Sequence, residues 1–593
     1  MYHTFHIPVL GLGYSIDTPL KVARYGISSV VSIVDDELTE RMRKFHALAH
    51  HEDYVPIDKK TADSRALRIT AYLNLLDQLV SRQFETLLNE NAEPGADFHK
   101  YFELLPEDSA LKLEYQEMLK INDRGSKKIA LSVLRPKMKP GSIDVNIMSK
   151  VDKANYNSHD EYLGDDYTDA LAAMRGFANS RLRAAVIISA GLNPRLYSYM
   201  EQCADFYPDP SGNLNKQIIL KVSDFRSAMV QAKMLAKKGL WVTEFRVESG
   251  LNCGGHAFAT EGFLLGPILE EFKEKRGLLM EELYAMYTAA LAAKNRTAAC
   301  KPLQRITAQG GIGTAEEHRF LLNYYQLDAA GWGSPFLLVP EATNVDDDTL
   351  TDLVHAEQSD FYLSNSSPLG VLFNSFRKNS MEQQRLERIA KGRPGSPCTK
   401  KFLCSNTEFT ALPICTASRE YQHAKLKELQ RQDLPEAAYQ LQFDAITEKI
   451  CLCEGLCASV YLKNGMLKPK EQKAVSICPG PNLAYFSGKY SLKEMVQHIY
   501  GQTNLLASVN RPNLFINELN LYIDYLRKDL SLQVAGLSTK KTKYFGKFKE
   551  QLQQGIAYYK QLLPVLKQET SISINDVYNQ LLLAEQQLET CKV

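Results

Sequence analysis

Apolar and polar residues along the first 340 positions follow two alternating patterns. Short runs rich in Val, Ile and Leu, typical of buried parallel strands, are separated by stretches whose apolar residues recur every three or four positions, as on amphipathic helices. The strand-like runs are HIPVLGLG, ISSVVSIV, GSIDVNIMSK, RAAVIISAGLNP, KQIILKVSD, LWVTEFRVES, RITAQGGIG and DAAGWGSPFLL. About eight strand–helix units in succession predict a (β/α)8 TIM barrel in preference to an open, doubly wound sheet.

A long polar stretch interrupts this rhythm between residues 35 and 139. Its segments are charged and have a helical period, as in SRALRITAYLNLLDQLVSRQFETLLNE. Because the strand–helix rhythm resumes at GSIDVNIMSK, we expect residues 35–139 to form a large helical insertion after the second strand.

The composition changes again beyond Glu341, where the strand signal is weak and most of the cysteines occur. From about Asn513 the chain consists of helical stretches rich in Gln, Lys and Tyr. A chain of 593 residues is too long for one ordinary domain. We therefore predict a barrel over residues 1–345, a cysteine-containing extension over 346–500 that packs on it, and a C-terminal helical region over 501–593.

Charge and hydropathy narrow the choice of partners. The chain has 70 Lys and Arg against 69 Asp and Glu, a net charge of +1, which argues against a nucleic-acid or membrane partner. No run of about 18 apolar residues predicts a transmembrane helix, and the N-terminus lacks the features of a signal peptide. We expect a cytoplasmic protein that acts on a small molecule; the composition leaves a homo-oligomer open.

Two glycine-rich loops follow the last two predicted strands. ITAQGGIG carries Gly310 and Gly311 directly before a predicted helix, and GWGS carries Gly331, Gly333 and Ser334. Glycines at such a junction let backbone N–H groups approach a phosphate, and a helix N-terminus favours negative charge. The loops after strands seven and eight form the usual phosphate site of (β/α)8 barrels. Two ordinary turns are the alternative, but consecutive loops of this kind favour phosphate binding.

The sixth predicted strand runs into VESGLNCGGHAFAT, residues 247–260, where His256 follows a pair of glycines. Histidine has an ordinary pKa near 6.5, so it can act as a base or as a cationic partner. The alternative is a turn whose histidine has no chemical role. A later apolar segment, SSPLGVLFNSF, residues 366–376, is either a lid that returns to the barrel mouth or a surface crossing.

These motifs together resemble one enzyme family. VLGLGYSIDTP, DVNIM, KVSD, ESGLNCGGH, AQGGI and GWGSPFLLVPEA occur in the order found in FMN-dependent nitronate monooxygenases (2-nitropropane dioxygenases) and in their relatives, the FMN-dependent enoyl-acyl-carrier-protein reductases. The resemblance spans about residues 5–345 apart from the insertion, and the chain looks like a long form with a C-terminal extension.

The resemblance implies a role for individual residues. Gly11 and Gly13 would approach the flavin, and Asn146 and Lys221 would meet its ring or ribityl chain. For Lys221, a solvated lysine at a strand end is the alternative. The FMN phosphate would be held by the two glycine loops, with Gln309 close by, and His256 would be the active-site histidine. The residues so assigned to the cofactor are Gly11, Gly13, Asn146, Lys221, Gln309, Gly310, Gly311, Gly331, Gly333 and Ser334.

The chain departs from the family in the histidine loop. The family pattern is E-A-G-G-H, whereas SGLNCGG separates Glu248 from His256 here. The extra residues predict a changed substrate side formed by Glu248, Asn252 and Cys253. A structural role for Cys253 is favoured over a reactive thiol.

Seven of the eleven cysteines lie between Cys398 and Cys478. The C-x-C-x3-C spacing of CLCEGLC differs from common zinc and ferredoxin patterns, which favour C-x2-C. CLCEGL is similar to an element of longer members of the family. We predict buried structural thiols and no bound metal; a metal or iron–sulfur site at Cys451, Cys453, Cys457 and Cys478, or redox disulfides, are the alternatives.

The sequence thus favours an FMN-dependent oxidoreductase that resembles nitronate monooxygenase and uses oxygen as acceptor. A first alternative is an FMN-dependent reductase of an enoyl thioester that takes electrons from NAD(P)H. A second alternative is a flavin-binding scaffold subunit without catalysis, against which the intact His256 and both glycine loops argue.

Overall fold

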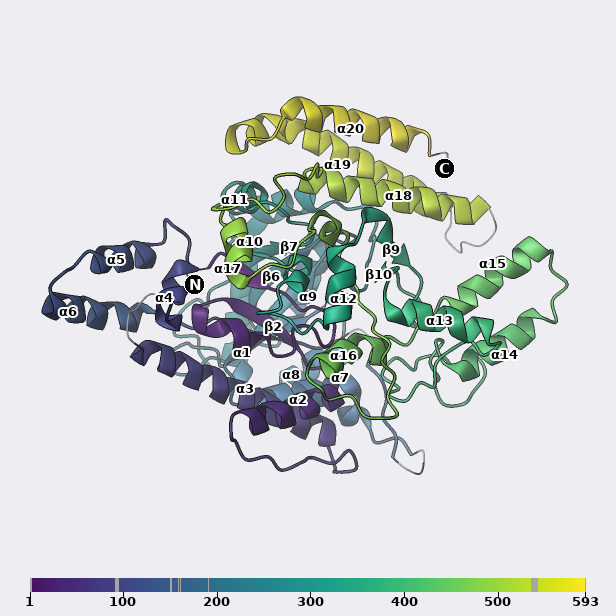
Figure 1. Cartoon of the computed structure of the whole chain (residues 1–593), viewed down its shortest axis with the longest axis horizontal. Coiled ribbons are helices and arrows are strands. Elements are labelled where there is room, and N and C mark those ends of the chain that lie inside the picture. The colour runs from purple at the N-terminus through teal and green to yellow at the C-terminus, as the bar shows by residue number, and fades with distance from the viewer. Residues whose placement is uncertain are drawn as a thin grey trace.

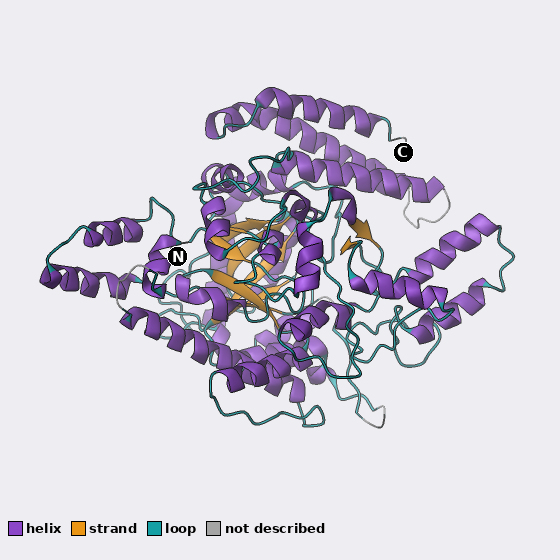
Figure 2. Cartoon of the chain, in the orientation of Figure 1, coloured by secondary structure: helices purple, strands orange, loops and turns teal. Residues whose placement is uncertain are grey.

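The computed structural model describes residues 3–90, 95–149, 152–157, 159, 161–189, 191–534 and 542–591. Within these residues eight parallel strands pair in sequence order and close into a barrel, since β1 pairs with both β2 and β8 (Figures 1 and 2). The predicted (β/α)8 barrel is confirmed, and the open sheet is excluded. The strands are β1 (Phe5–Ile7), β2 (Ser28–Ser32), β3 (Ile143–Asn146), β4 (Ala184–Ile188), β5 (Lys216–Val222), β6 (Val242–Glu248), β7 (Arg305–Gln309) and β8 (Ala329–Gly331).

Helices connect successive strands, as parallel pairing requires. Asp224 caps α9 by accepting a hydrogen bond from the amide of Ser227, and Thr314 caps α11 through the amide of Glu317. These caps end the preceding loops at defined residues. The connecting helices are α1 (Thr18–Val22), α7 (Asp169–Ala178), α8 (Pro194–Met200), α9 (Phe225–Ala236), α10 (Leu265–Ala293) and α11 (Ala315–Tyr324).

The polar stretch between β2 and β3 forms helices, as its period predicts. Asp35 caps the first of them, and Asp36 in its first turn pairs with Arg65 and Arg68 of the next, so the two helices are held together. The helices are α2 (Asp36–Ala49), α3 (Ser64–Asn89), α4 (Asp97–Glu103), α5 (Ala110–Leu119) and α6 (Arg124–Leu134). In Figure 1, α5 and α6 extend from the left side of the molecule.

The chain after the barrel is mainly helical. It also contains one antiparallel hairpin, β9 (Phe361–Ser364) with β10 (Phe373–Phe376). The last three helices lie across one end of the molecule, at the top of Figure 1. The helices are α12 (Asp347–Val354), α13 (Ser380–Ala390), α14 (Arg419–Leu429), α15 (Glu436–Thr447), α16 (Leu452–Lys463), α17 (Leu492–Ile499), α18 (Leu514–Val534), α19 (Thr542–Glu569) and α20 (Ile574–Glu589).

The region after the barrel shares its core with the barrel. One continuous cluster of buried apolar side chains runs from Phe5 in β1 to Leu588 in α20. Buried polar contacts join the same parts: Lys400 forms an ion pair with Asp35, and Tyr14 donates a hydrogen bond to the carbonyl of Ser476. Within the described residues, no helix combines the length and apolar character needed to cross a bilayer.

The barrel interior has an apolar and a charged half. The apolar half contains Val30, Ala185, Ile187 and Ile219. The charged half is centred on Arg246, whose side chain is 2% exposed and lies 2.7 Å from a Glu244 oxygen and 3.1 Å from an Asp144 oxygen. Glu244, Arg246 and Glu248 alternate along β6, so all three face inward. The charged side chains form a layer beneath the mouth of the barrel.

Candidate active site

A cavity of about 1190 Å³ opens at the carboxyl ends of the strands, where (β/α)8 enzymes carry their active sites. This volume exceeds the ~300–1,000 Å³ of a typical small-molecule site, so a cofactor and a substrate both fit. Every strand, at or just after its carboxyl end, contributes a lining residue. In order these are Pro8, Ser32, Asn146, Ser189, Lys221, Glu248, Gln309 and Gly331.

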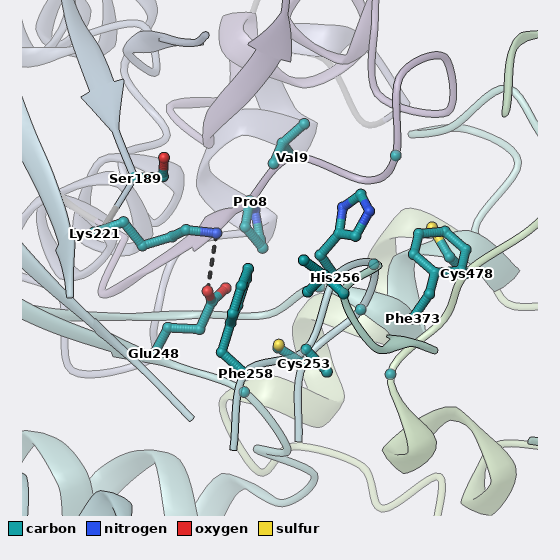
Figure 3. A pocket seen from close by; sticks show the side chains of 18 of the residues that line it. Pro8, Val9, Ser189, Lys221, Glu248, Cys253, His256, Phe258, Phe373 and Cys478 are labelled. Carbon is teal, nitrogen blue, oxygen red and sulfur yellow. Dashed lines mark ion pairs between the residues drawn. The ribbon is translucent and has the colours of Figure 1, made fainter. Parts of the chain in front are cut away.

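Three of the predicted residues form one polar cluster in this cavity. Lys221 Nζ lies 2.9 Å from Glu248 Oε2 (Figure 3). Gln309 Nε2 donates to the other oxygen of this carboxylate, Oε1, at 2.6 Å. Burial alone lowers the pKa of Lys221, but the neighbouring Glu248 carboxylate outweighs burial and raises it above its usual value. Lys221 is therefore a cation paired with Glu248 at the cavity wall, with its side chain 26% exposed.

The glycine loop after β7 also lines the cavity. Gly310 and Gly311 have φ angles of +112° and +77°, a region that side chains rarely adopt. A Cβ on Gly311 would lie 1.9 Å from Nδ2 of Asn252, so only glycine fits beside that amide. Asn252 is 1% exposed, and neither its amide nitrogen nor its amide oxygen has a hydrogen-bond partner in the described part of the chain. The wall of the cavity thus contains a buried side-chain amide that is not satisfied by the described residues.

The glycine loop after β8 meets a segment that sequence reasoning did not assign to the site. Ser334 Oγ accepts a hydrogen bond from the amide of Gly480 at 2.7 Å. A Cβ on Gly480 would lie 3.0 Å from the carbonyl carbon of Cys253. The sequence CPGPN, residues 478–482, thus inserts between the histidine loop and the loop after β8. A glycine between two prolines is the sequence feature that could have indicated a tight backbone segment at the site.

His256 projects from the loop after β6 at the cavity wall (Figure 3). Its Nε2 lies 2.7 Å from Ser367 Oγ, and its ring packs edge-on against Phe373 with centroids 5.0 Å apart. The backbone of the loop is joined to the β9–β10 hairpin, because the amide of Asn374 donates to the carbonyl of Gly255 at 2.9 Å. Residues 366–376 therefore lie at the barrel mouth, as the lid interpretation requires, and not on a remote surface.

Two cysteines line the cavity beside the histidine. Burial raises the pKa of the Cys253 thiol, with a smaller contribution from the Glu248 carboxylate, and burial raises the pKa of Cys478 to about 12. Both thiols are protonated at neutral pH and weakly nucleophilic, which supports the structural interpretation of Cys253.

The candidate metal ligands do not form a ligand cluster. In the described residues, no group of three or more His, Cys, Asp or Glu side chains is positioned to hold a metal ion. Cys453 and Cys478 line the cavity, whereas the Cys457 thiol donates to Asp35 Oδ2 at 3.3 Å and Cys451 precedes α16.

Most residues predicted for the cofactor converge on the cavity, and Gly13 is the exception. Gly11 lines the cavity, but Gly13 packs against α16, where a Cβ would lie 2.5 Å from Val460. Gly13 thus faces the extension, and its lack of a side chain is explained by helix packing. The predicted substrate-side residues Glu248, Asn252 and Cys253 all line the cavity.

No protein-family model matches the chain, and no curated protein matches it. Solved structures that resemble it include a FabK mutant from Thermotoga maritima, with 12% identity, 64% of this chain and 80% of that chain covered, and a TM-score of 0.29. The enoyl reductase domain of MlnA from the macrolactin biosynthesis cluster of Bacillus amyloliquefaciens has 14% identity, coverage of 69% and 87%, and a TM-score of 0.33. A nitroalkane oxidase from Streptomyces ansochromogenes has 13% identity, coverage of 58% and 88%, and a TM-score of 0.24. Identities and TM-scores this low assign neither a family nor a function.

Proposed function

We propose that the protein is an FMN-dependent oxidoreductase similar to nitronate monooxygenase, which oxidises a nitronate or a similar carbanion-like substrate with oxygen as acceptor. The observation that supports this most is the convergence of Asn146, Lys221, Gln309 and both glycine loops on one cavity at the carboxyl ends of the strands. These are the residues that the family resemblance assigns to the flavin.

The cavity wall suits a phosphorylated, partly polar cofactor. The positive φ angles at Gly310 and Gly311 are compatible with a backbone cradle for an anion. Among the described residues, the buried side-chain amide of Asn252 has unused hydrogen-bonding capacity. Lys221 supplies a positive charge in the same cavity. These residues fit FMN, whose phosphate would lie at the loops after β7 and β8.

The chemistry that FMN supplies when bound is the transfer of electrons from a carbanion-like substrate to oxygen. The protein's part is to orient the substrate and to balance its charge. In our proposal the His256 imidazole faces the substrate and either accepts its proton or neutralises its negative charge, while Ser367 and Phe373 hold the ring in place. Phe258, Cys253 and Leu372 line the same cavity and would limit the access of water to a bound substrate.

An anaerobic reduction experiment tests the proposal. The purified protein is loaded with FMN and mixed without oxygen with the nitronate anion of 2-nitropropane, with NADH or with NADPH. Loss of the visible flavin absorption with the nitronate, and none with NADH or NADPH, is the expected result. Reduction by NADPH alone would instead favour an enoyl-thioester reductase, and a protein that binds no flavin would refute both enzyme proposals.

A histidine variant tests the residue assignment. His256→Ala is expected to keep FMN bound but to slow the nitronate-dependent bleaching by about 10²-fold or more, the usual scale for loss of a general base. His355→Ala is the matched control, because His355 is exposed at the end of α12 and does not line the cavity. Unchanged bleaching in His256→Ala would show that the histidine has no chemical role.

A further inference from the structure

The loop between β7 and α11 is held by side chains that come from far along the chain. The carbonyl oxygens of Gly311, Ile312 and Gly313 each accept one hydrogen bond from the region after residue 480. The donors are Nη2 of Arg511 at 2.5 Å, Nδ2 of Asn482 at 2.9 Å and Nε2 of His498 at 2.9 Å. Arg511 and His498 do not line the cavity, whereas Asn482 does, so the loop is held both from behind and from the cavity side.

Arg511 is the centre of this arrangement. Its side chain is 4% exposed, and its remaining nitrogens donate to Glu317 Oε1 at 2.6 Å and to Asn482 Oδ1 at 2.8 Å. Glu317 in turn accepts from the amides of Gly313 at 2.9 Å and Leu514 at 2.6 Å. A planar guanidinium bound through all three nitrogens has one orientation, so the loop backbone has a fixed support.

His498 adds a second, uncharged support. Because a carbonyl only accepts, His498 Nε2 carries the proton that is donated to Gly313, and Nδ1 accepts from the amide of Leu505 at 3.2 Å. Burial lowers the pKa of His498, which is consistent with this neutral tautomer. Both ring nitrogens are therefore used, and the ring orientation is set.

Support of this kind matters because the backbone of the loop can adopt many conformations. Gly310 and Gly311 lack side chains and have positive φ angles, so an unsupported loop would sample many conformations. Anion binding requires successive amides that converge on one point. Fixing three consecutive carbonyls restricts the loop, and a preorganised loop binds its ligand more tightly.

We propose that Arg511, Asn482 and His498 are positioning residues for the phosphate monoester of the cofactor, so that the region after the barrel completes the phosphate site. This inference rests on the proposed function, because it concerns the same flavin. It implies that the protein distinguishes FMN from riboflavin, which lacks the phosphate, through residues that do not belong to the barrel.

The test measures the affinity of the full-length apoprotein for FMN and for riboflavin by flavin fluorescence. Arg511→Ala is expected to weaken FMN binding at least tenfold while riboflavin affinity changes less than twofold. Arg527→Ala, an exposed position of α18, is the control and should change neither affinity. An unchanged preference for FMN in Arg511→Ala, or an equal loss of both affinities, would overturn the inference.

A second pair of variants keeps the test decisive if Arg511→Ala does not fold. His498→Ala leaves the ion pair between Arg511 and Glu317 intact and should reduce the preference for FMN, whereas His498→Gln keeps an N–H donor for Gly313 and should restore most of it. Wild-type protein that binds neither flavin would refute the proposed function together with this inference. If the wild type prefers FMN over riboflavin, and His498→Ala and His498→Gln both keep the full wild-type preference, this inference alone is refuted.

Discussion

Glu518 on α18 offers a prediction whose size follows from the structure. The carboxyl is fully buried, and it accepts hydrogen bonds from Ser249 Oγ at 2.5 Å and from the amide of Leu265 at 2.8 Å. Ser249 begins the histidine loop and Leu265 begins α10, so Glu518 joins both to the C-terminal helices. Burial raises the pKa of Glu518 from 4.5 to about 7, although its hydrogen bonds lower it.

The sign of the pH dependence follows from that pKa. Below about pH 4.5 the carboxyl is protonated in both the folded and the unfolded chain, so it does not affect stability. Between about pH 4.5 and pH 7 the unfolded chain loses the proton while the folded chain keeps it, and the free energy of unfolding falls. A pKa difference of about 2.5 corresponds to a loss of about 3 kcal/mol above pH 7.

Glu518→Gln removes this loss. The amide is neutral at every pH, its oxygen can accept from Leu265, and its nitrogen can donate to Ser249 Oγ. The variant should match the wild type at about pH 4 and exceed its free energy of unfolding by up to about 3 kcal/mol at about pH 8. Urea unfolding, followed by the fluorescence of the buried Trp241 and Trp332, measures the difference at each pH.

The control is the exposed Glu550→Gln on α19, which should not change the pH dependence. A stability difference between Glu518→Gln and the wild type that stays constant from about pH 5 to about pH 8 would refute the reasoning, because it would mean that the carboxyl titrates alike in the folded and unfolded chain.

Three further variants test the site and the barrel. Gly311→Ala should abolish FMN retention, measured as the flavin content after gel filtration. The new Cβ would lie 1.9 Å from Asn252, and a side chain at a φ of +77° costs about 1–2 kcal/mol. A normal flavin content would contradict this prediction. Lys221→Met should slow anaerobic bleaching by a nitronate at least tenfold, because it removes the cation paired with Glu248, and an unchanged rate would exclude a role for that charge. Arg246→Met should lower the free energy of unfolding by about 3–5 kcal/mol in urea, because the buried Asp144 loses its cation and Glu244 keeps only Arg305. A loss below about 1 kcal/mol would contradict a buried ion pair.

The sequence determined the barrel to a large extent. All eight strand-like runs became barrel strands, and the helical period of residues 35–139 correctly predicted an insertion between the second and third strands. This succeeded because strand and helix periods depend on neighbouring residues, and because parallel strands joined by short helices have few ways to pair. The grouping of Asn146, Lys221 and Gln309 came from the family resemblance and not from the strand pattern, and all three line one cavity.

Only the tertiary structure decided which distant residues complete the site. Gly13 matches a family motif but packs on α16, while the segment at Gly480 and the side chains of Arg511 and Glu518 reach loops that lie 146 to 269 positions away along the chain. No local period encodes such contacts, because they depend on how the helices after the barrel pack across its mouth. The pattern of β6 shows the same limit: alternation placed Arg246 on one face of the strand, but only closure of the barrel brought Asp144 to it from β3.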